Sequence, residues 1–371
     1  MMSARFLTVV LERAFNMRDG FGREIDYMRI SVIDSCNLNC YYCNPCDNNE
    51  HCHALNILSV KEVLCIVRAA TRLGIKHFRL TGGEPLLHPQ LDEMVLQIKK
   101  ISGVSSVSLT TNAVLLAQHA KWLKEAGIDS INVSLDTIDA SEYERITKKP
   151  LFEEVKHGIN AAIECGIRVK INVVLTPQTD VVALTRYVAK KGTDIRFIEM
   201  MPVGEGHTNG VEPYKKVIGT LSKLYGEPCR INTEKTKEIN SGNDKRKIPD
   251  NGPAEYYIFP ELGIRVGLIQ AIHGKFCDTC NRIRVTADGR LMPCLGSSVT
   301  MDLVPDSWDF ADDVEKDFAI VRALRAAIKA KPRCHNFNDN AVTYTKTTET
   351  KTTEIEAAEV NAARNMSRIG G

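Results

Sequence analysis

The stretch Met28-Arg-Ile-Ser-Val-Ile-Asp-Ser-Cys-Asn-Leu-Asn-Cys-Tyr-Tyr-Cys43 joins an apolar run to a loop with three closely spaced cysteines. Its first six residues are rich in branched apolar side chains, which predicts a buried strand over residues 28–33. The thiols of Cys36, Cys40 and Cys43 follow with the spacing Cys-x3-Cys-x2-Cys. A [4Fe–4S] cluster normally takes four thiolates, so three of them can hold three irons and leave the fourth iron open to another ligand.

Other interpretations of this loop stay open from these residues alone. Cys46 continues the x2 spacing after Cys43 and could complete a closed, ferredoxin-like cluster. A zinc site with four thiolates also fits. Cys52 and His53 lie close by and could bind metal, although a solvated loop is the simpler interpretation.

Length and composition exclude several classes of protein. A chain of 371 residues is long enough for one large α/β domain and a smaller one. Lys and Arg number 48 and Asp and Glu 46, so no overall charge favours nucleic acid or an acidic membrane surface. The 12 cysteines cluster, which favours metal over disulfides.

The first twenty residues and the hydropathy of the chain bear on its location. No apolar run approaches the length of a transmembrane helix. Residues 1–20 mix arginines with an apolar core, which favours an ordinary N-terminal helix over a targeting segment. We therefore expect a cytoplasmic protein, with organelle targeting by this segment left open.

After the cysteine loop, predicted strands and helices alternate. Strands are expected over residues 28–33, 77–80, 106–109, 130–135, 168–175 and 194–199. Helices are expected over residues 59–73, 89–100, 115–126, 152–165 and 181–191, with capping boxes at 59–62 and 139–142. Such alternation predicts a parallel sheet, either doubly wound or an incomplete version of the (β/α)8 barrel, with chemistry at the carboxyl ends of the strands.

Polar or glycine residues do follow the predicted strands, and we expect them to gather on one face. They are Thr81-Gly-Gly-Glu84, Thr110-Thr-Asn112, Ser134, Asp136, Thr176, and the pair Met200 and Met201. A glycine pair permits close approach of the backbone. Gly-Gly-Glu-Pro is a weak motif alone, but one strand after the cysteine loop it is a strong one.

A second group of three cysteines lies in the C-terminal half: Cys277, Cys280 and, after a gap, Cys294. Cys-x2-Cys is also typical of zinc ribbons, and Cys229 or Cys334 could supply a fourth ligand. Three-thiol groups at both ends nevertheless favour two clusters, each with an exchangeable iron.

Two arginines follow this second group. Arg282 and Arg284 point the same way on a strand and suit an anionic or purine substrate. The alternative is an exposed arginine ladder on an edge strand.

The remaining segments are less informative. A helix is expected near residues 215–225, and residues 335–363 read as a linker or a surface helix. A diglycine end, Gly370-Gly371, is usually a frayed terminus, but it can also be a slender arm that enters a narrow pocket.

Together these motifs resemble a known family. Cys36-x3-Cys40-x2-Cys43 with Thr81-Gly-Gly-Glu-Pro85 resembles the radical S-adenosylmethionine (SAM) superfamily. The second cysteine group, Asn281-Arg-Ile-Arg284 and the diglycine end resemble the GTP 3′,8-cyclase family, which starts molybdenum-cofactor biosynthesis. The family usually has Arg and Met where this chain has Ser35 and Asn44.

The resemblance implies an α/β fold: an incomplete (β/α)6 TIM-type barrel with a smaller C-terminal domain that carries a second Fe–S cluster. The implied segments are an N-terminal extension (1–22), the partial barrel (23–205), the second-cluster and substrate domain (206–334), and a linker with the diglycine tail (335–371).

The implied activity is a lyase reaction. With two [4Fe–4S] clusters and SAM, GTP becomes (8S)-3′,8-cyclo-7,8-dihydroguanosine 5′-triphosphate. The implied partners are a reductant such as flavodoxin or ferredoxin and a downstream cyclic pyranopterin monophosphate synthase. The resemblance implies no nucleic acid and no membrane, and it is compatible with a homodimer.

Site residues are carried over by matching motif. The expected cluster ligands are Cys36, Cys40, Cys43, Cys277, Cys280 and Cys294. The expected SAM contacts are Tyr42, Gly83, Glu84, Ser134 and Met201. The expected GTP contacts are Arg29, Arg79, Thr110, Lys170, Arg282, Ile283 and Arg284. The catalytic set is expected to be Arg282, Arg284, Gly370 and Gly371.

Two other functions were weighed against this one. Another radical SAM maturase, acting on a peptide or tetrapyrrole, usually carries more auxiliary cysteines than the three in this chain. A non-enzymatic Fe–S carrier or zinc module has no use for Gly82-Gly-Glu84 or for six strand–helix units.

Overall fold

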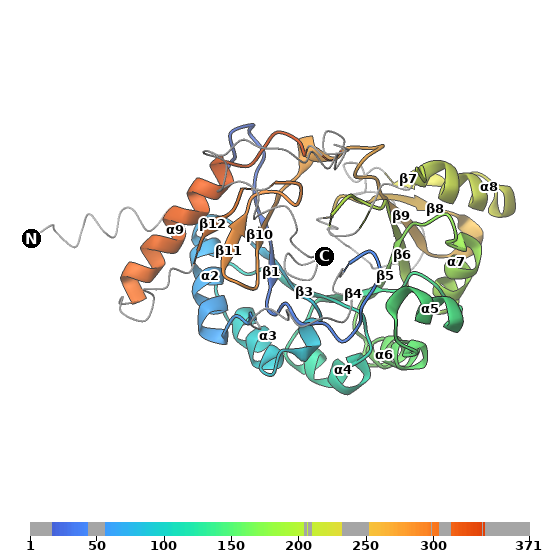
Figure 1. Ribbon diagram of the computed structural model, residues 1–371, viewed down its shortest axis with the longest axis horizontal. Helices are drawn as coiled ribbons and strands as arrows, with labels where there is room; N and C mark the ends of the chain where they lie inside the picture. The colour runs from blue at the N-terminus through green and yellow to red at the C-terminus, as the bar shows by residue number, and fades with distance from the viewer. Residues whose placement is uncertain are drawn as a thin grey trace, which may run out of the picture. The chain divides into compact units, whose positions relative to one another are not determined.

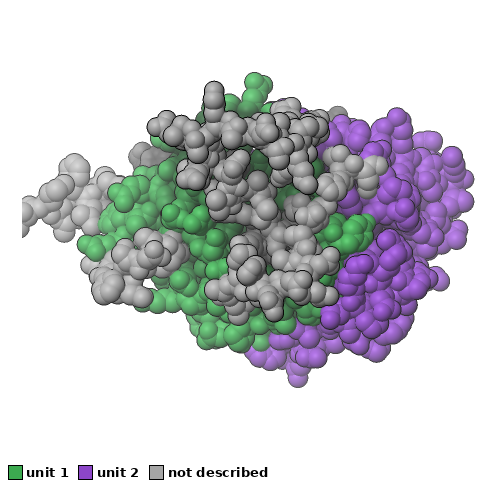
Figure 2. Space-filling model, viewed as in Figure 1, with its two compact units in different colours: residues 1–107, 201–207, 281–371 green, residues 108–200, 208–280 purple. Residues whose placement is uncertain are grey.

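The computed structural model describes residues 17–43, 56–203, 206, 210–231, 252–297, 299–303, 313–335 and 337. The chain divides into two compact units, coloured green and purple in Figure 2. Unit 1 comprises Met1–Val107, Met201–His207 and Asn281–Gly371, and unit 2 comprises Ser108–Met200 and Thr208–Cys280. Each unit therefore combines segments that are distant in the sequence.

Strands and helices alternate from residue 27 to residue 198, as the sequence predicted (Figure 1). In order, they are β1 (Tyr27–Ser31), α2 (Val60–Arg72), β2 (His77–Thr81), α3 (Leu91–Lys99), β3 (Ser106–Thr111), α4 (Leu116–Glu125), β4 (Ser130–Ser134), α5 (Ala140–Thr147), α6 (Phe152–Glu164), β5 (Val169–Val174), α7 (Val181–Lys190) and β6 (Asp194–Ile198). The prediction of an α/β fold with a parallel sheet is confirmed.

Unit 1 contains the strand order β12-β11-β10-β1-β2. The C-terminal strands are β10 (Arg282–Val285), β11 (Arg290–Met292) and β12 (Met301–Asp302). β1 pairs in parallel with both β2 and β10, and β10 pairs antiparallel with β11. Because β10 has a neighbour on each side, the alternative of an arginine ladder on an edge strand is wrong.

Unit 2 contains most of β3 and the strand order β4-β5-β6-β9-β8-β7 after it. The strands that follow β6 are β7 (Cys229–Ile231), β8 (Glu255–Ile258) and β9 (Arg265–Ile269), and β9 pairs in parallel with β6. The helix expected near residues 215–225 is present as a π-helical turn (Tyr214–Ile218) followed by α8 (Gly219–Tyr225). The sequence analysis missed β7, β8 and β9.

The two faces of the sheet differ in chemistry. Helices α2 and α3 belong to unit 1, and helices α4 to α7 belong to unit 2 (Figure 1). On β1, Met28 and Ile30 are fully buried and lie on one face of the strand. Side chains alternate along a strand, so Tyr27, Arg29 and Ser31 lie on the opposite face. On β1, the residues at positions 27, 29 and 31 therefore share the face opposite Met28 and Ile30.

The capping signals in the sequence were only partly right. At α2, Glu62 N donates to Ser59 Oγ (3.3 Å) and Ser59 N donates to Glu62 Oε2 (2.6 Å), which is the predicted reciprocal box. At α5, Glu142 N donates to Asp139 Oδ1 (2.8 Å), but the Glu142 carboxylate accepts from Arg145. The reciprocal half of that second prediction is wrong, because the arginine one turn later captures the carboxylate.

Two helices differ from the prediction. The helix predicted over residues 89–100 begins at Leu91, because a separate 3₁₀ turn (Pro85–Leu87) precedes it. The long C-terminal helix α9 (Asp313–Lys329) contacts α2 and was not predicted. Of the helices in the described ranges, none combines the length and apolar character needed to cross a membrane.

The cysteine loop is held by the glycine pair after β2. Gly83 N donates to Ile33 O (2.7 Å) and Glu84 N donates to Ser35 O (2.8 Å). A Cβ atom on Gly83 would lie 2.1 Å from Ser35 O, and one on Gly82 would lie 2.4 Å from Ile33 O. Only glycine permits so close an approach, so these two residues let the segment after β2 pack directly against the main chain that follows β1.

The carboxylate of Asp34 fixes the main chain just before the cysteine loop. Asp34 accepts from Asn56 N through Oδ1 (3.1 Å) and from Asn56 Nδ2 through Oδ2 (2.7 Å), and Asp34 N donates to Asn56 O (3.2 Å). Three bonds between two residues fix the chain where it leaves β1.

Gly83→Ala should lower the free energy of unfolding by about 1–3 kcal/mol, because the new methyl group overlaps the Ser35 carbonyl and must push the loop away. Urea denaturation followed by circular dichroism measures this. The matched control is Gly219→Ala in α8, where a Cβ meets nothing within 4 Å and alanine favours the helix. A Gly83→Ala chain as stable as the wild type would contradict the close approach.

Candidate active site

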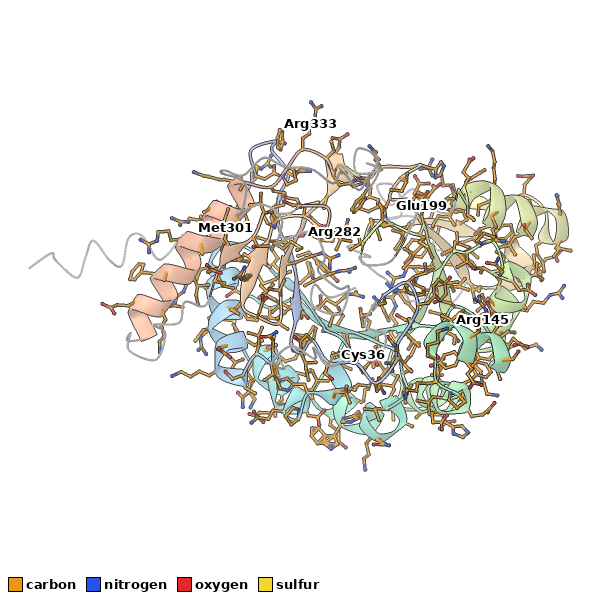
Figure 3. All side chains as sticks on the ribbon, viewed as in Figure 1. Cys36, Arg145, Glu199, Arg282, Met301 and Arg333 are labelled. Atoms are coloured by element: carbon orange, nitrogen blue, oxygen red, sulfur yellow. The ribbon has the colours of Figure 1, made fainter. Side chains whose placement is uncertain are left out.

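The first three cysteines lie on the loop after β1, and their side chains are half-buried. Figure 3 labels Cys36. The loop turns at its end, where Cys43 N donates to Cys40 O (2.9 Å). Leu38 N donates to Cys36 Sγ (3.5 Å). Hydrogen bonds to sulfur are typical of cluster thiolates because they stabilise the negative charge on the sulfur atom. The donor set and its surroundings therefore fit a cluster.

Within the described residues, the first three cysteines form no site for a single metal ion. Among the residues that the structure describes, no group of three or more His, Cys, Asp or Glu side chains could hold a single metal ion. A cubane makes no such demand, since each of its thiolates binds a different iron. The lack of a single-ion site among the described residues is therefore compatible with a cubane.

The second cysteine group is divided between the units. Cys277 and Cys280 lie at a 3₁₀ turn (Cys277–Thr279) at the end of unit 2, where Cys280 N donates to Cys277 O (3.1 Å). Cys294 follows β11 in unit 1 and is half-buried. The two alternative fourth ligands, Cys229 and Cys334, are exposed.

A buried carboxylate holds the loop that leads to Cys277. Glu199, which directly follows β6 and is labelled in Figure 3, is 4% exposed. It accepts from Ile272 N (2.7 Å), from His273 N (3.1 Å) and from His273 Nδ1. Sequence reasoning missed this role; its only signal was an acidic residue at the end of a buried strand.

Arginines occupy one row across three adjacent strands of unit 1. In the parallel register, Arg29 on β1 stands beside Arg79 on β2 and beside Arg284 on β10. Arg282 stands two residues before Arg284, so the two side chains share a face. We call Arg284, Arg29 and Arg79 the arginine row. The four arginines that were predicted to bind GTP from this unit are therefore neighbours.

The arginine row concentrates positive charge in a poorly hydrated place. Burial, and then the charge of Arg284, hold the pKa of the Arg29 guanidinium well below its ordinary value, and Arg79 and Arg282 add to this. Within the described residues, the buried Nε of Arg29 has no hydrogen-bond partner. Like charges packed together with an unmet donor form a site for an anion.

Tyr27 organises one end of the arginine row. Its hydroxyl accepts from Arg79 Nε, and both side chains are less than a tenth exposed. Tyr27 stands beside Arg282 and His77 in the register, one row below Arg29. Sequence reasoning missed Tyr27 because an aromatic residue at the start of a strand usually signals only core packing.

Ile283 occupies a different position from the two arginines that flank it. Its side chain is 1% exposed and stands beside Met28, on the apolar face. Any contribution of Ile283 to GTP binding would come from its main chain.

Polar side chains also follow one face of the unit 2 sheet. The parallel register places Thr110, Asn132, Lys170 and Asp194 in one row, and Ser134, Asn172, Arg196 and Gly267 in the next. Lys170 is 4% exposed and Asn132 is 2% exposed. Two of the predicted contacts, Thr110 and Lys170, therefore share a row.

Five members of these rows were not predicted as site residues: Asn132, Asn172, Asp194, Arg196 and Gly267. Arg196 is 4% exposed, and its Nε donates to Asn172 Oδ1 (3.0 Å). Within the described part of the chain, Arg196 Nη2 and Asn132 Oδ1 have no hydrogen-bond partner. A Cβ on Gly267 would lie 2.8 Å from Arg196 Cγ, so the glycine on β9 makes room for this arginine. The available signal in the sequence was Arg196 itself, a charged residue that alternates with apolar residues along a buried strand.

The residues predicted to contact SAM are spread over both units. In unit 1, Tyr42 is half-buried in the turn before Cys43, and Met201 is half-buried just after β6. Glu84 is 1% exposed and accepts from Leu86 N through Oε1 (3.0 Å), so it also caps the turn that follows it. In unit 2, Ser134 is exposed at the end of β4.

Some predictions fall outside the described residues. They are the diglycine end Gly370 and Gly371, the extra ligands Cys46, Cys52 and His53, residues 1–16 of the N-terminal segment, and the linker over 338–363. The four predicted domain segments also stay predictions.

Comparison with known families agrees with both halves of the site. Residues 30–183 match the radical SAM superfamily, and residues 193–337 match the family described as Molybdenum Cofactor Synthesis C. The first match begins on β1 and spans the cysteine loop and the glycine pair. The second spans Cys277, Cys280 and Cys294.

Among solved structures, Streptococcus suis SuiB bound to its precursor peptide SuiA is similar with a TM-score of 0.54 and 15% identity, covering 87% of this chain and 70% of that one. SuiB without that peptide gives a TM-score of 0.52 at 16% identity, covering 81% and 68%. At such identities the likeness shows the fold alone.

Curated relatives are much closer in sequence. GTP 3′,8-cyclase of Clostridium perfringens (strain SM101 / Type A) is 35% identical over 324 residues, which is 86% of this chain and 95% of that protein. GTP 3′,8-cyclase of Petrotoga mobilis is 35% identical over 331 residues, covering 87% and 96%. That of Peptoclostridium acidaminophilum is 37% identical over 328 residues, covering 86% and 94%. With nearly the whole length of these relatives matched and both parts of the site present, the chain belongs to the GTP 3′,8-cyclase family of radical SAM enzymes.

Proposed function

We propose that this protein converts GTP to (8S)-3′,8-cyclo-7,8-dihydroguanosine 5′-triphosphate in the first step of molybdenum-cofactor biosynthesis. Its family membership supports the reaction. The observation that carries the substrate is the arginine row, where Arg284, Arg29 and Arg79 stand side by side, and where burial and then the charge of Arg284 lower the pKa of Arg29. A triphosphate would bring several negative charges to such a cluster, which guanidinium groups can bind by charge-assisted hydrogen bonds.

Cys36, Cys40 and Cys43 are the proposed ligands of a first [4Fe–4S] cluster. When bound, that cluster supplies the electron that cleaves SAM and thereby starts the radical reaction. The protein's part is to position: the glycine pair and Asp34 hold the loop, and Tyr42 and Met201 offer an aromatic ring and a thioether to SAM. Glu84 is proposed to accept from the SAM amine, and Gly83 and Ser134 complete the proposed contacts.

The arginines are proposed to do two things. Arg29 and Arg79 bind and neutralise the triphosphate, while Arg282 and Arg284 lie on the strand that follows Cys280 and act on the nucleotide near the second cluster. Tyr27 holds Arg79 in place through its hydroxyl. From unit 2, Thr110 and Lys170 are proposed GTP contacts, and Arg196 joins them on the same face.

A second [4Fe–4S] cluster on Cys277, Cys280 and Cys294 is proposed from the family resemblance and from the three half-buried thiols. Its open iron would hold the guanine base. Gly370 and Gly371 are proposed to form an arm beside the arginines. The reductant, the downstream synthase, a homodimer and the cytoplasmic location stay proposals of the same kind.

Anaerobically reconstituted protein should carry about eight irons per chain, as two cubanes require. After reduction and addition of SAM and GTP, it should release 5′-deoxyadenosine and a cyclised nucleotide, both measured by liquid chromatography and mass spectrometry. Release of 5′-deoxyadenosine that does not depend on GTP would instead point to another radical SAM maturase. One or two zinc ions per chain in place of iron would refute both enzymes.

Arg29→Gln should weaken GTP binding about 10- to 100-fold, the value of one charge-assisted contact of about 1.5–3 kcal/mol. The same change should leave the thermal midpoint equal or higher, because the lowered pKa of Arg29 means that folding disfavours its charge. Calorimetric titration with GTP and a thermal melt give the two readouts. The matched control is Arg145→Gln, since Arg145 is exposed and paired with Glu142 on α5. A large loss of stability in Arg29→Gln would assign the residue a structural role.

Deletion of Gly370-Gly371 should spare folding and both clusters but abolish the cyclised product. Iron content, a thermal melt and product analysis separate these effects. Full turnover by the shortened chain would rule out the proposed arm.

A further inference from the structure

A buried lysine lies just beyond the end of α9. Lys331 is 3% exposed, and its Nζ donates to Arg282 O (2.7 Å) and to Pro293 O (2.9 Å). All three residues belong to unit 1. Lysine is rarely buried unless its ammonium group meets acceptors, so a lysine placed between two carbonyl groups has a specific task.

The two carbonyl groups lie at one end of the β10–β11 pair, at the first residue of β10 (Arg282) and at the residue after β11 (Pro293). In the β10–β11 ladder, Val285 pairs with Leu291 and Arg284 pairs with Met292. Continued outward, this register would place Ile283 opposite Pro293 and Arg282 opposite Cys294, and there the side chain of Lys331 links the carbonyl groups of Arg282 and Pro293. Pro293 has no N–H to donate, so the main chain alone cannot continue the ladder at that residue.

Both strands continue directly into the second cysteine group. Pro293 immediately precedes Cys294, and Arg282 follows Cys280 by two residues. Asn281 between them is also fixed: its Nδ2 donates to Asp26 Oδ1 (2.7 Å) and its carbonyl accepts from Tyr27 N (3.3 Å). Lys331 therefore acts where the position of Cys294 relative to β10 is decided.

Lys331 is itself held in place by its neighbours. The guanidinium of Arg23 donates to Pro332 O (2.6 Å) and to Arg333 O (2.9 Å), and its Nε donates to Asp19 (2.6 Å). Figure 3 labels Arg282 and Arg333. The segment after α9 is thus tied to the N-terminal segment on one side and to β10 and β11 on the other. A side chain anchored in this way is pre-organised to hold the strand ends.

We propose that Lys331 is a positioning residue for the second cysteine group: it holds the main chain before Cys294 against the start of β10 so that this thiolate meets the cluster. It also sets the carbonyl of Arg282, so the same contact keeps the strand of Arg282 and Arg284 in register with the cluster. The proposal rests on the second cluster of the proposed function.

The test uses iron as its readout, in chains that keep one cysteine group at a time. With Cys36, Cys40 and Cys43 replaced by alanine, the wild-type Lys331 background should take up about four irons per chain. Lys331→Met keeps the apolar stem but removes the donors, and it should lower that iron to less than one per chain and remove the paramagnetic resonance signal of the reduced cluster. Lys331→Arg, which can still donate to both carbonyl groups, should restore at least half of the iron.

Two controls make the result specific. Lys329→Met changes an exposed lysine at the end of the same helix and should leave the iron unchanged. In the reciprocal background, with Cys277, Cys280 and Cys294 replaced by alanine, Lys331→Met should keep all of the first-group iron.

Each remaining outcome counts against one idea. Loss of iron from both groups, or failure of both Lys331 variants to fold by circular dichroism, would make Lys331 a residue of the general fold and overturn the proposal. Unchanged second-group iron in Lys331→Met would overturn it as well. If the chain that retains only Cys277, Cys280 and Cys294 binds no iron even with Lys331 intact, the second cluster itself fails instead.

Discussion

The contact between the cysteine loop and the glycine pair after β2 is the constraint on which the first site depends. The loop carbonyls of Ile33 and Ser35 each accept a main-chain N–H from the segment Gly83–Glu84. Neither bond leaves space for a side chain at Gly82 or Gly83. These bonds thus join the segment that leads into the cysteine loop to the glycine pair, although the two are distant in the sequence.

Unit 1 also holds the arginine row, an arrangement of like charges that is unfavourable without substrate. Arg29 is flanked by two further arginines in the register. Burial and then the charge of Arg284 lower its pKa, which means that folding disfavours the charged guanidinium. The surrounding structure keeps the arginines together despite their repulsion, since Tyr27 fixes Arg79 and β10 is paired on both sides. Functional sites often sacrifice stability in this way, because the unmet charge is recovered when an anion binds.

Groups outside the motifs hold the second cysteine group. Glu199 binds the loop before Cys277, and Lys331 binds the main chain before Cys294. One is a buried carboxylate that accepts from N–H groups, and the other is a buried amine that donates to carbonyl groups. Cluster ligands on irregular loops need such partners, because loops lack the ladder bonds that fix residues in strands.

The sequence by itself determined the alternation of strands and helices, most of their boundaries within a few residues, and the cysteine and arginine motifs. These signals are local: apolar period, capping residues and motif spacing act within one element or one turn. It did not reveal β7 to β9, β11, β12 or α9, whose partners are distant in the chain. Only the tertiary structure decided that Arg29, Arg79 and Arg284 are neighbours, that Asn132 and Arg196 lie on the polar face, and that Lys331 donates to the carbonyl groups of Arg282 and Pro293. The physical reason is that strand register and burial depend on which segments pair across long separations, and no single stretch of sequence carries that information.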